Sequence, residues 1–289
     1  MILIVGSTGR LGGAIARRLL AEGRRVRVLA RPSSNYAPLA DAGAEPVFGD
    51  LKDPGSLTAA CDGIDTVVTT ANAAGRGGDD TFEAVDDEGN RHLIEAAAAS
   101  RVDHYVFVSV LDADPSNPSP LVRAKGLTEE RLRASGVTHT IIQPDVYMDL
   151  LIPMVVGPAV QAGRPVKLVG SGIRKHSFVA MEDAAAFTIA ALHGEAAKNA
   201  TIRVGGPSAL SWQDIVDVVA TEIGRQIPVE SVAPGTPMDG LPDFVTGLLA
   251  ALEMYDSSVD MTGASAMFGI EPTPLSAWVR RTLVPMTTA

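Results

Sequence analysis

The sequence predicts an α/β protein whose first half forms a doubly wound parallel sheet. Strand-like and helix-like segments alternate through this half, which is the pattern of parallel strands joined by crossover helices. The first strand, Ile2–Val5, is continuously apolar, as expected of a strand buried on both faces. A glycine-rich turn follows it and leads into an amphipathic helix over Leu11–Glu22, which Gly23 ends.

Further strands and helices complete this half in alternating order. The strands are predicted over Arg25–Ala30, Ala44–Phe48, Thr66–Thr70, Tyr105–Val110 and Thr138–Gln143. The helices are predicted over Pro54–Cys61, Asp86–Ala99 and Ala124–Ala134. Right-handed crossovers then give a doubly wound sheet, in which ligands bind at the carboxyl ends of the strands.

After Pro144 the pattern loosens, and we predict a smaller C-terminal substrate lobe. Ser211 and Asp214 have the spacing of a capping box that opens a helix through Glu222. The other elements are predicted as a strand over Ile202–Val204, a loop over Pro228–Pro242 and helices over Phe244–Glu253 and Pro274–Leu283. The predicted boundary lies between residues 145 and 146, so that residues 1–145 form the sheet domain and residues 146–289 the lobe, some segments of which return to the sheet.

Composition narrows the class of protein. The chain has 289 residues and a net charge of −10, which argues against a general grip on nucleic acid or on an anionic membrane. Cys61 is the single cysteine, so an intrachain disulfide and a cysteine-cluster metal site are excluded and a reducing compartment is indicated. The chain opens directly on a strand, which leaves no room for a signal peptide, and no apolar run approaches the ~20 residues of a membrane span. We expect a cytoplasmic protein with no bound metal.

The glycine-rich turn has the spacing GxxGxxG, with Gly6, Gly9 and Gly12 between a strand and a helix. Gly6 permits a sharp turn, Gly9 lets the backbone approach a pyrophosphate, and Gly12 lets the helix lie close to the sheet. The helix N-terminus then offers N–H groups and the positive end of its dipole to the phosphates. The turn therefore predicts a Rossmann-type dinucleotide site, which also includes the turn residues Thr8, Arg10 and Leu11; the alternative is a tight turn with a structural role only.

The end of the second strand predicts which nicotinamide cofactor binds. An NAD site usually has Asp or Glu there to hold the ribose 2′-hydroxyl, whereas this strand ends Leu29-Ala30-Arg31-Pro32. The Arg31 guanidinium can pair with a 2′-phosphate, and Arg10 is within reach of the same group. We therefore predict NADP(H) in preference to NAD(H); the alternative is that both arginines are solvated surface residues.

Several segments resemble the NmrA-like atypical short-chain dehydrogenase/reductase family. The resemblance rests on the glycine turn, Phe48-Gly49-Asp50-Leu51, the segment from Gly89 to Ala96, Tyr105–Ser109, Ser135-Gly136-Val137 through Pro144, and His176–Ala185. It covers most of the chain and is specific for fold and cofactor rather than for substrate. It implies that Asp50 and Leu51 lie beside the adenine, Thr70 and Ala71 line the dinucleotide, and Pro144 and Val146 lie near the nicotinamide. For Asp50 the alternative is the cap of a turn.

Typical short-chain dehydrogenases use Tyr-x-x-x-Lys, in which tyrosine protonates the carbonyl and lysine holds the nicotinamide ribose. Here Leu121 takes the place of the tyrosine, while Lys125 is retained. This departure resembles the isoflavone-reductase-like, triphenylmethane-reductase-like and quinone-reductase-like branches, which implies conjugated or quinoid acceptors that need little proton assistance. Lys125 is predicted as a ribose clamp and a possible proton donor, the alternative being a solvated helix lysine.

Three more side chains are candidates for the substrate side. Ser109 ends the fifth strand on the ligand side, and Tyr147 follows Pro144 closely, so we predict both in the catalytic site with Lys125. Each has the alternative of a packed structural residue, and a structural role is favoured for His176. The loops Ala73–Thr81 and Asp112–Pro120 are predicted at the ligand edge of the sheet.

We therefore expect an NADPH-dependent reductase that transfers a hydride to a small conjugated, aromatic or quinoid acceptor. Catalysis would be mainly positioning in a dry pocket. The alternative is an NmrA-like redox sensor that binds dinucleotide without turnover and acts on a protein partner; isomerase or epimerase chemistry ranks last, because those relatives keep Tyr-x-x-x-Lys. Monomer and homodimer fit the composition equally well.

Overall fold

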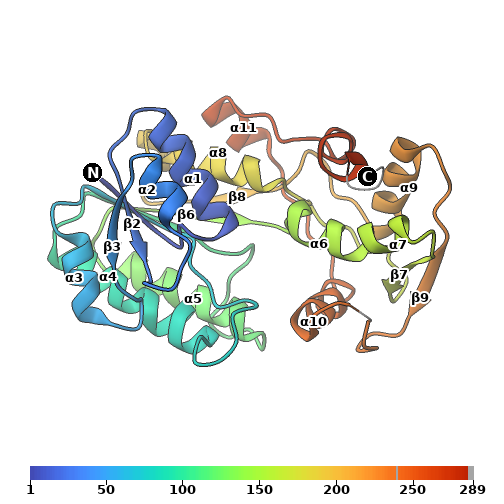
Figure 1. Ribbon diagram of the computed structural model, residues 1–289, viewed down its shortest axis with the longest axis horizontal. Helices are drawn as coiled ribbons and strands as arrows, with labels where there is room; N and C mark the ends of the chain where they lie inside the picture. The colour runs from blue at the N-terminus through green and yellow to red at the C-terminus, as the bar shows by residue number, and fades with distance from the viewer. Residues whose placement is uncertain (239, 286–289) are drawn as a thin grey trace. The chain divides into compact units, whose positions relative to one another are not determined.

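The computed structural model describes residues 1–238 and 240–285, and Figure 1 follows the chain from end to end. The chain divides into two compact units. The first comprises Met1–Pro144 and Ala184–Arg203, and the second comprises Asp145–Asp183 and the residues from Val204 onward. Asp239, in the predicted loop, and residues 286–289, in the predicted lobe, lie outside the described residues.

A seven-stranded sheet forms the centre of the first unit, in the order β3-β2-β1-β4-β5-β6-β8. Its strands are β1 (Ile2–Val5), β2 (Val26–Ala30), β3 (Glu45–Phe48), β4 (Thr66–Thr69), β5 (His104–Val108), β6 (His139–Pro144) and β8 (Ala200–Val204). The pairs from β3 through to β6 are parallel, with Val5 opposite both Leu29 and Thr69. The order reverses between β1 and β4, and this switch point is where doubly wound sheets bind their ligands. The predicted fold class is confirmed.

Helices cover both faces of this sheet (Figure 1). They are α1 (Arg10–Ala21), α2 (Ala37–Asp41), α3 (Pro54–Cys61), α4 (Asn90–Ala99), α5 (Pro120–Ala134), the short 3₁₀ helix η2 (Glu195–Ala197) and α8 (Met181–Ala191), which continues from the second unit into the first. Helices α3, α4 and α5 lie on one face, and α1 and α8 lie on the other. Between the sheet and the first of these layers lies a core that includes Leu3, Leu57, Leu93 and Phe107.

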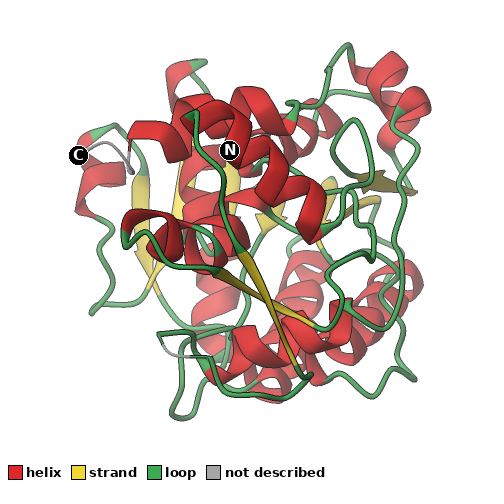
Figure 2. Ribbon diagram, turned by 90° about the vertical axis from the view of Figure 1, so that its right-hand side faces the viewer, coloured by secondary structure: helices red, strands yellow, loops and turns green. Residues whose placement is uncertain are grey.

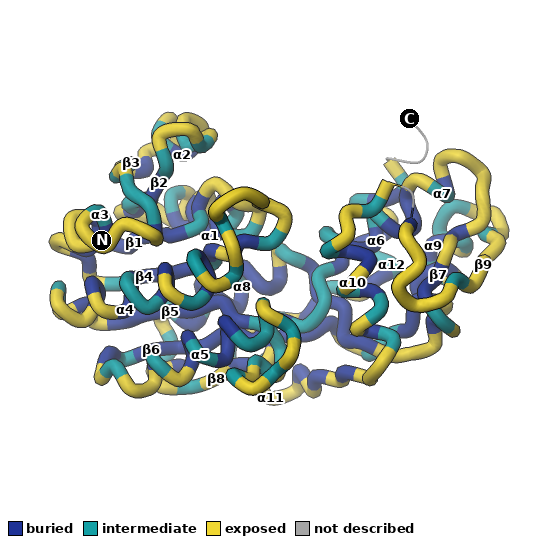
Figure 3. Tube along the Cα trace, turned by 90° about the horizontal axis from the view of Figure 1, so that it is seen from below, coloured by how far each residue is buried: buried dark blue, intermediate teal, exposed yellow. Residues whose placement is uncertain are grey.

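The central strands are buried along their whole length, whereas the edge strand β3 is partly exposed (Figure 3). Parallel strands in the middle of such a sheet are shielded on both faces by helices, which is why β1 is continuously apolar and β4 and β5 are mainly so. The buried strands form a rigid support, and the candidate site residues lie at or just after their carboxyl ends.

One predicted helix has a different start. The segment predicted as a single helix over Asp86–Ala99 is a π-helical turn, η1 (Phe82–Gly89), followed by α4. The Thr81 side chain accepts a hydrogen bond from the Ala84 N–H and so caps η1. The Asn90 side chain donates to the carbonyls of Val85 and Asp86, which adds side-chain bonds to the wider turn. Periodicity of 3.6 residues does not reveal such a turn, and π-turns are frequent at functional sites.

The second unit is mainly helical, with a short sheet of its own (Figure 2). Its elements are α6 (Met148–Val155), α7 (Gly157–Gln161), β7 (Val166–Val169), α9 (Trp212–Ile223), β9 (Val229–Val232), α10 (Asp243–Leu252), α11 (Thr262–Phe268), α12 (Leu275–Trp278) and the π-helical η3 (Val279–Leu283). The prediction of a loop throughout Pro228–Pro242 is wrong, because β9 lies within it and pairs in parallel with β7. The strand is four residues long, and its partner is distant in the sequence, so no local pattern marks it.

Aromatic residues form the centre of the second unit. Phe178 packs edge-on against Trp212 with ring centroids 5.3 Å apart, and Trp278 is fully buried in the same cluster. The predicted capping box at the start of α9 is confirmed: the Ser211 hydroxyl accepts from the Asp214 N–H at 3.0 Å, and the Asp214 carboxylate accepts from the Ser211 N–H at 2.9 Å. Among the described helices of the whole chain, none combines the length and apolarity needed to cross a membrane.

Candidate functional site

The glycine turn is packed so closely that larger residues would not fit. Gly6 has a φ of +85°, and a Cβ there would lie 2.8 Å from the Ala71 nitrogen and from the Thr70 hydroxyl oxygen. A Cβ on Gly12 would lie 2.4 Å from the Gly6 carbonyl oxygen. The turn, the end of β4 and the first turn of α1 therefore touch through backbone atoms, as a close backbone approach to a phosphate requires.

The start of α1 is suited to hold an anion. Gly9 is its N-cap in an extended conformation and provides no side-chain cap. The first N–H groups of a helix have no partner within the helix, and the helix dipole adds partial positive charge there. Thr8 and Arg10 are exposed at this end and Leu11 is half-buried. A glycine-lined turn at an uncapped helix start therefore fits a pyrophosphate.

The residues predicted beside the adenine follow β3. The Asp50 carboxylate accepts a hydrogen bond from the Lys52 N–H at 2.9 Å, so it closes a turn as well as facing the carboxyl edge of the sheet. Leu51 is buried, and its Cβ would lie only 2.9 Å from a Cβ on Gly89. The structure thus gives Asp50 the turn-capping bond that was its alternative role, and it gives Leu51 a place in the core.

Arg31 does not stand alone at the end of β2. Its guanidinium donates to the Asp80 carboxylate at 2.7 Å, and Lys52 donates to the other oxygen of that carboxylate at 2.6 Å. Arg76 lies 3.5 Å from Asp80. The hydrogen bond from Lys52, together with the bond from Arg31, holds the pKa of Asp80 below its usual range, although partial burial acts in the opposite direction. The arginine predicted for the 2′-phosphate is therefore already paired with an anion.

Thr70 and Ala71 follow β4 at the switch point of the sheet. The Thr70 N–H donates to the Val5 carbonyl at 3.0 Å, so the segment continues alongside β1 just past the strand. The Ala71 carbonyl accepts a hydrogen bond from the Lys125 ammonium at 3.2 Å. These contacts bring the predicted dinucleotide-lining residues of β4 and the predicted catalytic lysine of α5 together.

Lys125 is buried, with 2% of its surface exposed. Its ammonium lies 3.2 Å from the Asp86 carboxylate, donates to the carbonyls of Ala71 and Val108, and sits 4.9 Å from the centre of the Phe107 ring. An ammonium has three N–H donors, and two carbonyls accept hydrogen bonds from this one. The Asp86 Oδ1 lies at ion-pair distance but has no hydrogen-bond partner within the described structure. The environment is unlike that of a solvated surface lysine, because the charge is neutralised by a carboxylate with no exposed surface.

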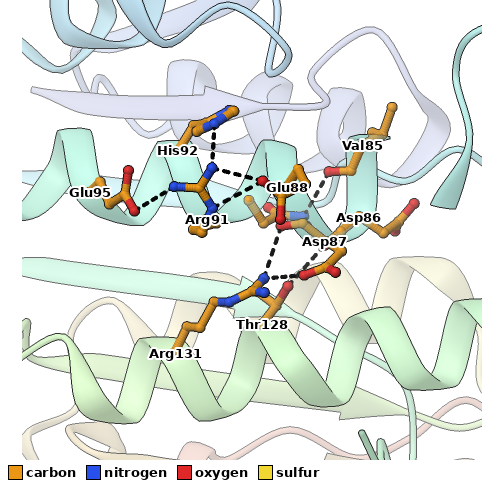
Figure 4. A network of polar contacts seen from close by, with 10 residues as sticks. Val85, Asp86, Asp87, Glu88, Arg91, His92, Glu95, Thr128 and Arg131 are labelled. Carbon is orange, nitrogen blue, oxygen red and sulfur yellow. Dashed lines mark hydrogen bonds and ion pairs between the residues drawn. The ribbon is translucent and has the colours of Figure 1, made fainter. Parts of the chain in front are cut away.

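The position of Asp86 is fixed from several sides (Figure 4). Its other carboxylate oxygen accepts from the Ala73 N–H at 2.8 Å, and its carbonyl accepts from the Thr128 hydroxyl of α5 at 2.8 Å. Arg131, one turn further along α5, binds the neighbouring Asp87 carboxylate. In Figure 4 the Asp86 side chain points away from this second network. The π-helical turn therefore holds one acid toward Lys125 and the next toward Arg131.

Ser109 and Pro144 end the two strands beside this pair. The Ser109 N–H donates to the Ile142 carbonyl at 2.8 Å, while its hydroxyl is buried without a hydrogen-bond partner within the described structure. The hydroxyl of Ser7, in the glycine turn, is likewise buried without a hydrogen-bond partner within the described structure. The Pro144 carbonyl accepts from the Leu111 N–H at 3.0 Å. Buried hydroxyls without partners are uncommon, and they are candidates to bind a ligand.

Val146 and Tyr147 belong to the second unit, so the structure does not relate them to the residues above. Tyr147 begins α6 and forms a parallel bridge with Val179. Its hydroxyl is buried without a hydrogen-bond partner within the described structure, and burial raises its pKa well above the usual tyrosine value. This environment disfavours the ionised phenolate.

His176 is enclosed in a hydrogen-bond network of the second unit. Its Nε2 lies 3.0 Å from the Leu252 carbonyl oxygen and its Nδ1 lies 2.7 Å from the Ser257 hydroxyl, which in turn donates to the Asp145 carboxylate at 2.7 Å. The imidazole is completely buried. These contacts fit the structural role that was favoured for this histidine.

Sequence reasoning missed four residues of the first unit that contact the predicted ones. Asp86 pairs with Lys125 and Asp80 pairs with Arg31, while Lys52 and Arg76 contact Asp80. Asp86 and Asp80 stood within a predicted helix and a predicted loop, where acids are common. A useful signal would have been the retained Lys125 itself, because a lysine buried behind a parallel sheet requires a counter-charge.

Comparisons with known proteins agree with this geometry. A family model described as NAD(P)H-binding matches residues 6–195. The photosystem II assembly factor Ycf39 of Cyanophora paradoxa is 29% identical over 231 residues, which make up 80% of this chain and 71% of that protein. The NAD(P)H azoreductase of Xenophilus azovorans is 29% identical over 235 residues, 81% of this chain and 77% of that protein.

Solved structures share the fold across almost the whole chain. The NADPH complex of the quinone oxidoreductase QOR2 from Escherichia coli has a TM-score of 0.80 at 22% identity and covers 97% of this chain and 99% of that one. The NADP(H) complex of the triphenylmethane reductase from Citrobacter sp. has a TM-score of 0.82 at 20% identity, covering 98% and 100%. At these identities the likeness concerns the fold.

Proposed function

The chain belongs to the NAD(P)H-binding family, and from that premise we propose that it is an NADPH-dependent reductase of a small conjugated, aromatic or quinoid acceptor. The observation that carries the proposal is the pairing, in one unit, of the close-packed glycine turn with Lys125 buried at the ends of β4 and β5. The first feature suits a dinucleotide, and the second suits the reactive end of that dinucleotide.

The residues present fit a dinucleotide. Gly6, Gly9 and Gly12 with the start of α1 would hold the pyrophosphate, and Arg31 would face the 2′-phosphate because no acid follows β2. Thr70 and Ala71 would line the dinucleotide, and Pro144 would lie near the reduced nicotinamide, whose ring supplies the hydride when it is bound. The preference for NADPH over NADH is part of the proposal and depends on Arg31.

Lys125 acts on the cofactor side of this site. To hold the nicotinamide ribose, its ammonium exchanges one of its bonds to the carbonyls of Ala71 and Val108 for a ribose hydroxyl, while Asp86 keeps the charge paired. A lysine so enclosed orients the cofactor and is a poor source of protons for a substrate. Leu121 stands where a tyrosine acid would stand, which favours acceptors that take a hydride at carbon.

Two hydroxyls remain proposed for the acceptor side. The Ser109 hydroxyl, just after β5, has no hydrogen-bond partner among the described residues, so it can bind an acceptor oxygen or a ribose hydroxyl. Tyr147 is proposed as an aromatic wall and a proton donor of the second unit. Burial raises the pKa of Tyr147, which makes its hydroxyl a weaker acid and favours the role of an aromatic wall over that of a proton donor. The proposed reductase is cytoplasmic and works as a monomer or homodimer, which cell fractionation and size-exclusion chromatography test.

The deciding experiment follows absorbance at the reduced-nicotinamide band. Purified protein and NADPH are mixed with quinones, triphenylmethane dyes, azo dyes, enones and simple aldehydes. Acceptor-dependent oxidation of NADPH by the wild type, strongly reduced in Lys125→Met, is the expected result. Oxidation by Lys125→Met at the wild-type rate would remove Lys125 from the site, and turnover of aldehydes alone would contradict the proposed acceptor class.

A second candidate is a dinucleotide-binding protein without turnover that acts on a protein partner. The similarity to Ycf39, a photosystem II assembly factor by name, favours it. The same experiment separates the two candidates. Binding of NADPH with no oxidation by any acceptor, together with a change in protein–protein association between the oxidised and reduced cofactor, would establish this candidate instead of the reductase.

A further inference from the structure

The end of the loop Ala73–Thr81 carries an acid that three cations surround. They come from three separate places in the sequence: Arg31 follows β2, Lys52 follows β3, and Arg76 lies in the loop itself. The distances from their nitrogens to the Asp80 carboxylate are 2.7, 2.6 and 3.5 Å. One carboxylate, with two oxygens, is thus the direct partner of three cations.

Resting on the proposed function, we propose that Asp80 is a specificity-determining residue for the cofactor. Its carboxylate occupies the anion site formed by Arg31, Lys52 and Arg76, and the 2′-phosphate of NADPH takes that site by displacing it. Asp80 thereby sets how strongly NADPH is preferred to NADH, which has no group to displace it.

The chemistry of the site fits a phosphate monoester better than a carboxylate. A phosphate monoester carries about −1.5 to −2 charges at neutral pH and three strong acceptor oxygens, whereas a carboxylate carries one charge. Three cations can each bind a separate phosphate oxygen. Asp50 and Asp79 also attract Lys52, but neither is in the cluster of direct contacts. With three oxygens, a phosphate can therefore accept from Arg31, Lys52 and Arg76 at once, which the two oxygens of a carboxylate cannot do one to one.

The three cations are accessible to a ligand, although Asp80 is enclosed. The side chains of Arg31, Lys52 and Arg76 are 40%, 33% and 33% exposed, and that of Asp80 is 9% exposed. An incoming phosphate can thus approach the cations from solvent and replace the carboxylate from the outside.

The loop can release Asp80 at small cost. Gly75, Gly77 and Gly78 have positive φ angles, and a Cβ at any of them would meet open space, so this part of the loop packs against little. Its backbone bonds include Arg76 N–H to Ala73 carbonyl at 3.0 Å and Asp80 N–H to Gly77 carbonyl at 3.3 Å, both local. The Ala73 N–H is bound to Asp86, which anchors the start of the loop while its far end moves.

The test compares the dissociation constants of NADPH and NADH for the wild-type protein and Asp80→Asn, measured by titration of cofactor fluorescence. Asn removes the competing charge at nearly constant size. We expect NADPH to bind about three- to tenfold more tightly to Asp80→Asn, with NADH unchanged. The change is modest because each ion pair between solvent-accessible side chains contributes less free energy than a tenfold change in a dissociation constant represents. Asp79→Asn is the matched control, because Asp79 is an exposed acid of the same loop that attracts Lys52 and is not among the direct contacts of the cluster; it should tighten NADPH binding clearly less than Asp80→Asn and leave NADH unchanged.

A second pair of variants tests the site without touching Asp80. Lys52→Ala and Arg76→Ala should each weaken NADPH several-fold and leave NADH unchanged. Unchanged or weaker NADPH binding in Asp80→Asn would overturn the inference, and so would unchanged NADPH binding in both Lys52→Ala and Arg76→Ala. If Arg31→Ala still lowers the affinity for NADPH selectively, the proposed cofactor preference survives that failure. If Arg31→Ala affects NADPH and NADH equally, both proposals fall.

Discussion

Two ion clusters of the first unit differ in almost every physical respect. The Lys125–Asp86 pair is one cation with one acid, and its two side chains are 3% and 0% exposed. The Asp80 cluster gathers three cations around one acid, and each cation is at least one third exposed. The two clusters are connected by the loop that starts at Ala73, which Asp86 holds, and ends near Asp80.

The difference teaches what each cluster is able to do. Taking a charge out of water is costly unless a partner remains, so the buried pair cannot exchange its ions freely and serves as a fixed point. The exposed cluster is screened by water, so each of its bonds is weak and its anion can be replaced. We therefore expect substitutions in the buried pair to change folding and substitutions in the exposed cluster to change selectivity.

The largest effect is expected for Asp86→Ala. Removing one partner leaves the Lys125 ammonium buried without a counter-charge, and breaking such a pair costs about 3–5 kcal/mol of unfolding free energy. Urea denaturation measures the loss. The double variant Asp86→Ala with Lys125→Met should lose clearly less than Asp86→Ala alone. A double variant that is less stable than either single one would break the comparison, because the two charges would then not be coupled.

The next effect concerns the glycine turn before α1. In Gly12→Ala the new Cβ meets the Gly6 carbonyl at 2.4 Å, so α1 must move away from the turn. We expect a loss of about 1–3 kcal/mol of stability and at least tenfold weaker binding of both cofactors, measured by thermal melting and calorimetric titration.

Gly247→Ala is the matched control for that change. Gly247 lies in α10, and a Cβ there meets open space, so the variant should be more stable by about 0.5–1 kcal/mol and bind cofactor normally. Equal effects of the two substitutions would show that close packing of the turn is unimportant.

A smaller and selective effect is expected for Arg31→Ala. The exposed guanidinium contributes little to folding, so the melting temperature should change little. NADPH should bind about tenfold more weakly, whereas NADH should not, because only the 2′-phosphate loses a partner. The ratio of the two dissociation constants is the measured quantity, and an unchanged ratio would contradict the assignment.

The smallest effect is a pH dependence of the exposed cluster. The hydrogen bond from Lys52 and that from Arg31 lower the pKa of Asp80 in the folded protein. A lowered carboxyl pKa contributes stability that is present above the pKa of the unfolded chain and is lost as the pH falls through the folded value. Between neutral pH and pH 3 the wild type should thus lose under about 1 kcal/mol more than Asp80→Asn. An identical acid profile for the two proteins would show that the cluster adds nothing to stability.

The site was predictable where it depends on backbone geometry. The GxxGxxG spacing, the apolar strand before it and the helix after it are neighbours in the sequence, and these local features identify a close turn at a helix start. The capping box of Ser211 and Asp214 was predictable for the same reason, because its two bonds join residues three apart. The glycine turn, with its strand and helix, also predicted that the cofactor is a nicotinamide dinucleotide.

Side-chain partners were not predictable in this way. Nothing in the local pattern connects Lys125 to Asp86 or Arg31 to Asp80. The first pair meets only when α5 packs against η1, and the second only when the loop after β4 reaches the end of β2. The strand β9 was missed because its pairing with β7 joins two distant segments. The π-turn of η1 was missed because a wider turn carries no periodic signal of its own.

The sequence by itself thus determined the alternation of strands and helices in the first half of the chain, the close glycine turn before α1 and the absence of an acid after β2. The spacing of apolar residues and of glycines involves residues that are close together in the sequence, so it can be read without the structure. Only the tertiary structure decided which charges are paired, which are buried and which anion Arg31 holds. Those outcomes depend on distances between segments that the fold brings together, and on the water that it removes from some ion pairs and leaves around others.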